Sequence, residues 1–243
     1  MARLHRKELK HDEFVDTVDR VLLYVEGHGR RLAALAVAIV LGSAAVGGYW
    51  WYSGQQAEKA SIALGAAMVT FEAPVQAGLP SLPGQGTERV FSSEEEKWQA
   101  ALEEFAAVRE EYPGTQAGLL ARHYEGVCKL RLGQQEPGLA ALEEVSRASD
   151  PEVAALAKFH LAGFYQGVGR AEEAEKFYRE LSEKPTATVP KAVALFDLAA
   201  LVAEKNPAEA RQLYQQVKDE FPDTTIAAEV TRRLELLPEP PQP

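Results

Sequence analysis

Hydrophobic and polar positions divide the chain into one long apolar run near the N-terminus and a series of amphipathic segments. Residues 32–52 form a run of 21 residues without a charged side chain. At about 1.5 Å per residue, a helix of this length spans the roughly 30 Å hydrocarbon core of a bilayer. Arg30 and Arg31 precede the run, and Trp50 and Trp51 lie at its end, where interfacial aromatic residues are typical. This pattern predicts a transmembrane anchor.

The basic residues around this run predict its orientation. Arg20, Arg30 and Arg31 precede it, whereas Lys59 is the basic residue that soon follows. The positive-inside rule therefore places residues 1–31 in the cytoplasm and the rest of the chain outside it. A cleaved signal peptide is the alternative, but the region before its apolar run would be 31 residues long. The run itself also exceeds the usual length of about 7–15 residues.

The predicted cytoplasmic tail, residues 1–31, contains a short amphipathic helix. Phe14, Val18 and Val25 recur at helical spacing, and Gly27 and Gly29 are expected to end the helix. Acidic residues occupy its other faces, which favours contact with a protein over contact with anionic lipid. Self-association, or a solvated helix without a partner, is the alternative.

The rest of the chain repeats one pattern of small, large and aliphatic residues. Its leading small residue is found at positions 101, 138, 174 and 210, at intervals of 37, 36 and 36 residues. A period of this length with helical spacing throughout predicts an α-solenoid. The small residue lets a paired helix approach, the larger residues fill the core, and a proline ends the helix. The signature residues are Ala101, Phe105, Val108 and Pro113; Gly138, Leu142 and Val145; Ala174, Tyr178 and Leu181, followed by Pro185; and Ala210, Tyr214, Val217 and Pro222.

Partner helices are predicted between these segments, over residues 117–133, 157–169 and 191–203. The first of them contains Gly126 and Gly133, seven residues apart. The arrangement resembles the tetratricopeptide repeat, a helix-turn-helix unit, over residues 94–222. In the first partner helix, Arg122, Glu125 and Lys129 fall where a strict repeat register would place core residues, so this register must be slipped.

The segments on either side complete the predicted all-α architecture. A helix over residues 55–75 continues from the anchor and supplies the first helix of the first repeat. A Gly- and Pro-rich loop follows, so residues 53–92 form a membrane-proximal helix and loop. A capping box, either Ser92 with Glu95 or Ser93 with Glu96, opens a repeat domain of about four helix pairs over residues 93–237. Residues 224–237 are its capping helix, and residues 238–243 are a disordered tail.

Charge and composition exclude several kinds of function. The formal net charge is −10, and residues 53–243 carry 19 basic and 30 acidic side chains. A phosphate backbone would be repelled, so no nucleic-acid partner is expected. One cysteine in 243 residues excludes a disulfide framework.

Few reactive side chains are available for chemistry. His123 and His160, on predicted helices one repeat apart, are better explained as hydrogen-bonded structural residues than as metal ligands. Cys128 is better explained as a small buried hydrophobic residue, although a disulfide between chains is the alternative. We expect no catalytic residue, cofactor, metal or small-molecule substrate. The expected function is binding of proteins, for which an apolar groove is a candidate site, formed by Phe159, Phe164, Leu195, Phe196 and Val202.

The order of these elements resembles a family of single-pass bacterial inner-membrane proteins with a periplasmic tetratricopeptide-like domain. An ancillary subunit of the Sec translocon belongs to that family. The resemblance rests on the short tail, on the anchor ending in residues 49–61, and on the repeat block ending in residues 221–237. It implies translocon subunits, a periplasmic chaperone and unfolded exported proteins as partners. The alternatives are a structural scaffold in envelope assembly or cell division and a regulatory membrane enzyme.

Overall fold

The computed structural model describes residues 13–76 and 89–238, which form nine α-helices and no β-strand. The chain divides into two compact units, Met1–Gln55 and Gln56–Pro243. The predicted tail of residues 238–243 lies outside the described residues except for Pro238, and the predicted loop lies outside them over residues 77–88.

The first helix, α1, extends over Glu13–Glu72. Gly27 and Gly29 lie inside it, so the prediction that they end a helix is wrong. A glycine costs a helix only about 1 kcal/mol relative to alanine, and the flanking residues are helix formers. Among the described residues, no helix is both long enough and apolar enough to cross a membrane. The predicted anchor also includes Leu32, Leu35 and Ala36, whose side chains lie outside the described residues.

The C-terminal part of α1 belongs to the second unit and packs in its core. Ala67 is buried there, and Phe71 packs edge-on against Trp98, at 5.1 Å between ring centroids, and against Phe105, at 5.9 Å. After the helix, the amide of Gln76 donates a 2.9 Å hydrogen bond to the carbonyl of Phe91. This bond ties together the two ends of the segment between α1 and α2.

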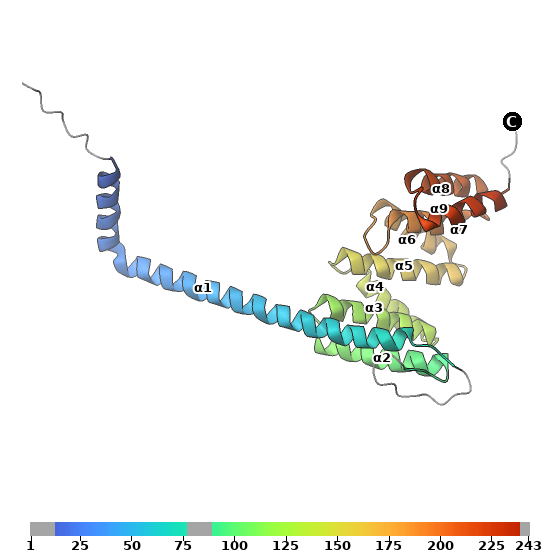
Figure 1. Ribbon diagram of the computed structural model, residues 1–243, viewed down its shortest axis with the longest axis horizontal. Coiled ribbons are helices and arrows are strands. Elements are labelled where there is room, and N and C mark those ends of the chain that lie inside the picture. The colour runs from blue at the N-terminus through green and yellow to red at the C-terminus, as the bar shows by residue number, and fades with distance from the viewer. Residues whose placement is uncertain (1–12, 77–88, 239–243) are drawn as a thin grey trace, which may run out of the picture. The chain divides into compact units, whose positions relative to one another are not determined.

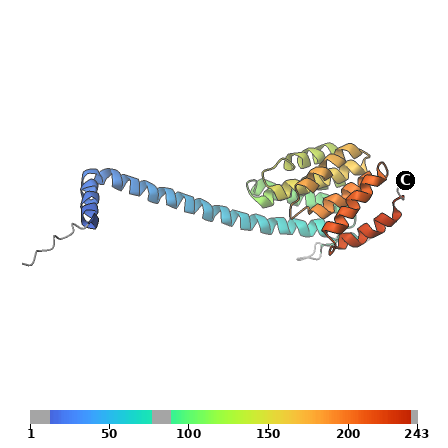
Figure 2. The same cartoon turned by 90° about the horizontal axis from the view of Figure 1, so that it is seen from above.

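Eight further helices follow (Figures 1 and 2). Their bounds are α2 Glu94–Glu111, α3 Gln116–Arg131, α4 Gln135–Val145, α5 Pro151–Gly167, α6 Ala171–Glu183, α7 Lys191–Val202, α8 Pro207–Glu220 and α9 Thr225–Leu236. Each packs against the next along the chain, and α3 also contacts α5. This is the stacking of helix pairs that defines an α-solenoid, so the predicted all-α solenoid is confirmed.

The repeated signature marks the buried face of every second helix. Ala101 and Phe105 of α2, Ala174 of α6 and Ala210 of α8 are completely buried, and Tyr178 and Tyr214 are nearly so. Positions separated by four and then three residues share one helical face, which explains why this spacing recurs. Pro113 and Pro222 each follow the residue after the last helical residue, as expected for prolines that end a helix.

Two glycines close the first helices of successive pairs in the same way. Gly133 after α3 and Gly169 after α5 have φ angles of 75° and 78°, a left-handed conformation that strains other residues. The amide that follows each glycine bonds back to a carbonyl five residues earlier, at 2.8 Å in both turns. This pattern is a Schellman motif, and it turns the chain directly into the second helix.

The predicted N-cap of α2 and the predicted capping helix are found at the two ends of the repeat array. Ser93 accepts a hydrogen bond from the Glu96 amide at the start of α2, so the Ser93–Glu96 alternative holds. The carboxylate of Glu96 accepts from the Ser92 amide, one residue before the usual partner. At the other end, Val230 of α9 is completely buried against the core around Tyr214, and α9 therefore covers the last apolar face.

Candidate functional site

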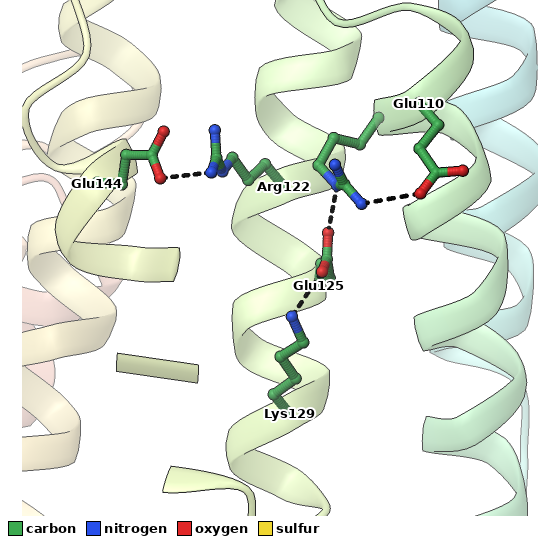
Figure 3. A network of polar contacts seen from close by, with 6 residues as sticks. Glu110, Arg122, Glu125, Lys129 and Glu144 are labelled. Atoms are coloured by element: carbon green, nitrogen blue, oxygen red, sulfur yellow. Dashed lines mark hydrogen bonds and ion pairs between the residues drawn. The ribbon is translucent and has the colours of Figure 1, made fainter. Parts of the chain in front are cut away.

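The polar residues that interrupt the predicted register of the second repeat take part in a polar network between α2 and α3 (Figure 3). Glu125 is only 7% exposed and accepts hydrogen bonds from Arg109 Nε at 2.7 Å and Lys129 Nζ at 2.6 Å. Arg122, on another side of α3, pairs with Glu144 of α4. Glu125 and Arg122 therefore face opposite charges supplied by α2 and α4, and Lys129 pairs with Glu125 within α3.

The ionisation of Glu125 depends on these two cations. Burial opposes the charged form, but the hydrogen bonds and charges of Lys129 and Arg109 outweigh it and lower the pKa of the carboxyl group. Glu125 is therefore a carboxylate at neutral pH. Arg109 comes from α2, so its bond to Glu125 fastens α3 to α2, whereas Lys129 lies one turn further along α3 itself.

A close approach of two glycines joins α3 to α4. A Cβ atom on Gly138 would lie 2.8 Å from Leu130 Cδ2 and 3.0 Å from the carbonyl oxygen of Gly126. A Cβ atom on Gly126 would lie 3.0 Å from Leu142 Cγ. Both glycines are thus required by packing, which is the role that the repeat signature predicts for its small residues.

His123 and His160 come together from α3 and α5, with 4.7 Å between ring centroids. His123 is completely buried, and neither of its ring nitrogens has a hydrogen-bond partner among the described residues. The prediction of a hydrogen-bonded histidine is therefore wrong for His123. Burial, aided by the charge of His160, lowers the pKa of His123 to about 3, and burial also lowers the pKa of His160. Within the described part of the chain, no group of three His, Cys, Asp or Glu side chains could hold a metal ion.

Cys128 is also completely buried, as predicted for a small hydrophobic residue. Burial raises the pKa of its thiol to about 12. The thiolate is the reactive form of cysteine, so this side chain is inert in the folded protein at neutral pH.

The five residues predicted to form an apolar groove do not share one surface role. Leu195 and Val202 are only 4% and 5% exposed and leave little surface for a partner. Phe159, Phe164 and Phe196 are half-buried and contact other aromatic rings. The five residues lie on α5 and α7. These two helices are apolar on all sides because each is packed in the solenoid core on both of its sides.

The structure contains a groove that the sequence did not indicate. It lies between α4, α5 and α6 and has a volume of about 870 Å³. We call it the α4–α6 groove. One wall is apolar, with Phe177 and Leu181, and the charged side chains around it include Arg147, Lys158 and Lys184. A second groove of about 530 Å³, which includes Leu195, lies between α6, α7 and α8, and we call it the α6–α8 groove.

Comparison with known proteins identifies the family. Residues 24–237 match the family model described as a tetratricopeptide repeat-like domain, which is most of the chain. The protein belongs to this family. No curated protein and no solved structure matches the chain.

The tetratricopeptide repeat-like family accounts for the coarse character of the site. Repeat domains of this kind are generally non-catalytic modules that bind other proteins, and the expectation of a protein-binding function rests on this family. The repeat signature, read from the sequence, identified the core and the turns of the array. It could not identify the α4–α6 groove, because only Leu181 among the residues that line the groove belongs to the signature.

Proposed function

We propose that this protein is a membrane-anchored scaffold that binds other proteins through its tetratricopeptide repeat-like array. The observation that carries this proposal is the joining of two parts by α1. One part is the repeat array, which belongs to a family of protein-binding repeats, and the other is the uncharged run of residues 32–52. A protein with this organisation holds its partners at a membrane surface.

The support for an anchor comes from the run itself. The large apolar and aromatic side chains described between Val37 and Tyr52 are all more than half exposed, and Trp50 reaches 75%. A helix with apolar side chains on every side needs an apolar environment, which a bilayer provides. Arg30 and Arg31 before the run favour a cytoplasmic N-terminus. We therefore propose a single-pass protein of a bacterial inner membrane with a periplasmic repeat domain.

The more specific proposal is that this scaffold assists newly exported proteins beside the Sec translocon. It is supported by the resemblance of the anchor and repeat block to the family that includes an ancillary translocon subunit. Partners in this case are translocon subunits, a periplasmic chaperone and unfolded exported chains. A structural scaffold in envelope assembly is the alternative, in which residues 32–52 serve only as a tether.

Crosslinking in intact cells tests the proposal directly. A photoreactive amino acid at an exposed position of α5 and another near Trp50 should each capture proteins, which are identified after purification in mild detergent. Capture of translocon subunits by the anchor position supports the specific proposal. Capture of envelope proteins alone favours the structural scaffold, and absence of any captured protein from both positions contradicts the scaffold function.

Replacing residues 32–52 by an unrelated transmembrane helix separates the two versions of the proposal. A tether requires only a hydrophobic helix of the same length, so the exchange would leave partner capture by the repeat domain unchanged. A translocon contact through the anchor would be lost with the native sequence. Release of the native protein from membranes by high salt would contradict the anchor itself, since salt displaces proteins held at membrane surfaces by charge.

A further inference from the structure

The α4–α6 groove is positively charged in a domain that is otherwise acidic. Its lining contains the three cations Arg147, Lys158 and Lys184 and the two carboxylates Glu143 and Glu180. Residues 53–243 as a whole carry 19 basic and 30 acidic side chains. The groove therefore reverses the sign of the surrounding domain, and this reversal requires an explanation other than solubility.

Two of the three cations are not used to hold the fold together. Lys158 forms a 2.7 Å ion pair with Glu180 and links α5 to α6. Arg147 lies 3.9 Å from Glu143, a long separation for an ion pair, and its side chain is 72% exposed. Lys184 has no ion-pair partner among the described residues. Arg147 and Lys184 thus offer charge at the groove without a strong partner among the described residues.

The α6–α8 groove shows that this property does not follow from the repeat geometry. Its cations are Arg179 and Lys191, and both are paired. Arg179 bonds to Glu175 and Glu209, at 2.7 and 2.5 Å, and Lys191 bonds to Glu220 at 2.7 Å. The equivalent groove one repeat later is therefore neutralised from within the chain, whereas the α4–α6 groove is not.

An apolar wall accompanies the free charge. Phe177 is half-buried and stacks on Tyr165, with 6.1 Å between ring centroids and 3° between ring planes, which fixes its orientation beside the groove. Ala154 and Leu181 also line the groove. A fixed aromatic ring beside small side chains can accept an apolar side chain of a partner, as aromatic anchors do in protein interfaces.

We propose that the α4–α6 groove binds an acidic segment of a partner protein that also carries apolar side chains. The proposal rests on the protein-binding function proposed above and names the partner class of one of its surfaces. The groove is open to solvent, whereas a small-molecule site buries most of its ligand. A nucleic acid would meet the acidic domain around the groove. A peptide fits because its carboxylates pair with Arg147 and Lys184 while its apolar side chains pack on Phe177.

Fluorescence anisotropy with the full-length protein in mild detergent tests this inference. The probe is a short labelled peptide of glutamate and leucine residues separated by serines. One control peptide has lysine in place of every glutamate, and a second has serine in place of every leucine. We expect the first peptide to bind, the lysine peptide not to bind, and the leucine-free peptide to bind more weakly.

Charge-reversal variants locate the binding to the groove. Arg147→Glu with Lys184→Glu reverses the two cations that have no strong partner among the described residues, and both side chains are exposed, so we expect the fold to be retained. Lys205→Glu with Lys218→Glu is the matched control, because both lysines are exposed and lie outside both grooves. The groove pair should weaken binding by about tenfold or more, and the control pair by less than about twofold. Equal binding of the lysine peptide, or equal effects of the two pairs, would overturn the inference.

The same variants keep this inference separate from the proposed scaffold function. If crosslinking in cells captures partners but the peptides do not discriminate by charge, the scaffold function stands and the groove inference fails. If the acidic peptide binds the groove but no protein is captured in cells, the groove inference stands and the scaffold function fails. Loss of partner capture in the Arg147→Glu, Lys184→Glu protein, with capture retained in the control pair, supports both.

Discussion

The buried histidine on α3 should make the repeat domain sensitive to acid. His123 is completely buried, its ring nitrogens have no hydrogen-bond partner among the described residues, and its pKa is lowered to about 3. In the unfolded chain the same side chain titrates near pH 6.5. Between these two pH values His123 is protonated in the unfolded state and neutral in the folded state. The stability that neutral His123 permits is therefore fully present above pH 6.5 and is lost as the pH falls toward 3.

The size of the effect follows from the difference between the two pKa values. Each pH unit between them changes the free energy of unfolding by about 1.4 kcal/mol. Acidification to about pH 4.5, roughly two units below the unfolded pKa, should thus lower stability by about 2–3 kcal/mol through His123 alone. Such a loss is a large part of the stability of an ordinary domain, about 5–15 kcal/mol.

A variant in which residue 123 cannot titrate separates the contribution of His123 to the pH dependence of stability from that of the many carboxylates of the chain. His123→Leu keeps an apolar side chain of similar size, and urea unfolding of both proteins is followed by far-UV circular dichroism near neutral pH and near pH 4.5. The variant should lose about 2–3 kcal/mol less than the wild type over this interval. His160→Leu is the comparison variant: it removes the lowered pKa of His160 as well, so its loss should be smaller than that of the wild type, but the part that is due to burial of His123 should remain.

Parallel loss of stability in the wild type and His123→Leu would refute this reasoning. It would mean that His123 is solvated or hydrogen-bonded in the folded protein and titrates there as it does in the unfolded chain. Two of the groups near the pair are Tyr124, on the same helix as His123, and Arg131, which lies close enough to His160 to lower the pKa of His160 further. Both proteins keep these two groups, so their contribution is shared by the two sides of the comparison.

Three further predictions concern packing, charge and reactivity, the first two measured as free energies of unfolding in urea. Gly138→Ala should lower the free energy of unfolding by about 1–3 kcal/mol, because the new Cβ atom would meet Leu130 and the α3 backbone. Gly114→Ala is the control, and it should lower the free energy of unfolding by less than about 1 kcal/mol because there is open space around Gly114. Similar values for the two variants would contradict the close approach of α3 and α4. Glu125→Ala should lower the free energy of unfolding by about 2–4 kcal/mol. A double-mutant cycle with Arg109→Ala should give a coupling energy of about 1 kcal/mol or more, and additive effects of the two substitutions would contradict the network. Cys128 should react with a maleimide only after unfolding in urea; labelling of the folded protein at the rate of a free thiol would show that it is exposed.

Much of the fold could be predicted because every second helix repeats one solution to the same packing problem. Each of these helices lies between two neighbours, so it needs a small residue for close approach and two larger residues on the same face. Ala174, Tyr178 and Leu181 of α6 meet this requirement, and the same spacing recurs in α2, α4 and α8. A face that is buried in the same way in each repeat leaves a periodic trace in the sequence.

The first helices leave no such trace, because their polar residues are explained by contacts with particular partners. Glu125 interrupts an apolar pattern, and its place in the fold depends on Arg109, which lies on another helix. His123 and His160 are separated by a full repeat, and their contact depends on how α3 crosses α5. Sequence spacing within one helix contains none of this information.

The same contrast explains why the charge of the α4–α6 groove escaped sequence analysis. Arg147, Lys158 and Lys184 belong to three different segments, and each is unremarkable as one charge on a helix or turn. Two of the three have no strong partner in the part of the chain that the structure describes, whereas Arg179 and Lys191 one repeat later are paired. Pairing of this kind is a property of neighbouring helices and varies between repeats without disturbing the core. In a solenoid, whose repeats share their buried faces, differences in surface pairing are therefore the means by which one repeat can acquire a partner that its neighbours do not bind.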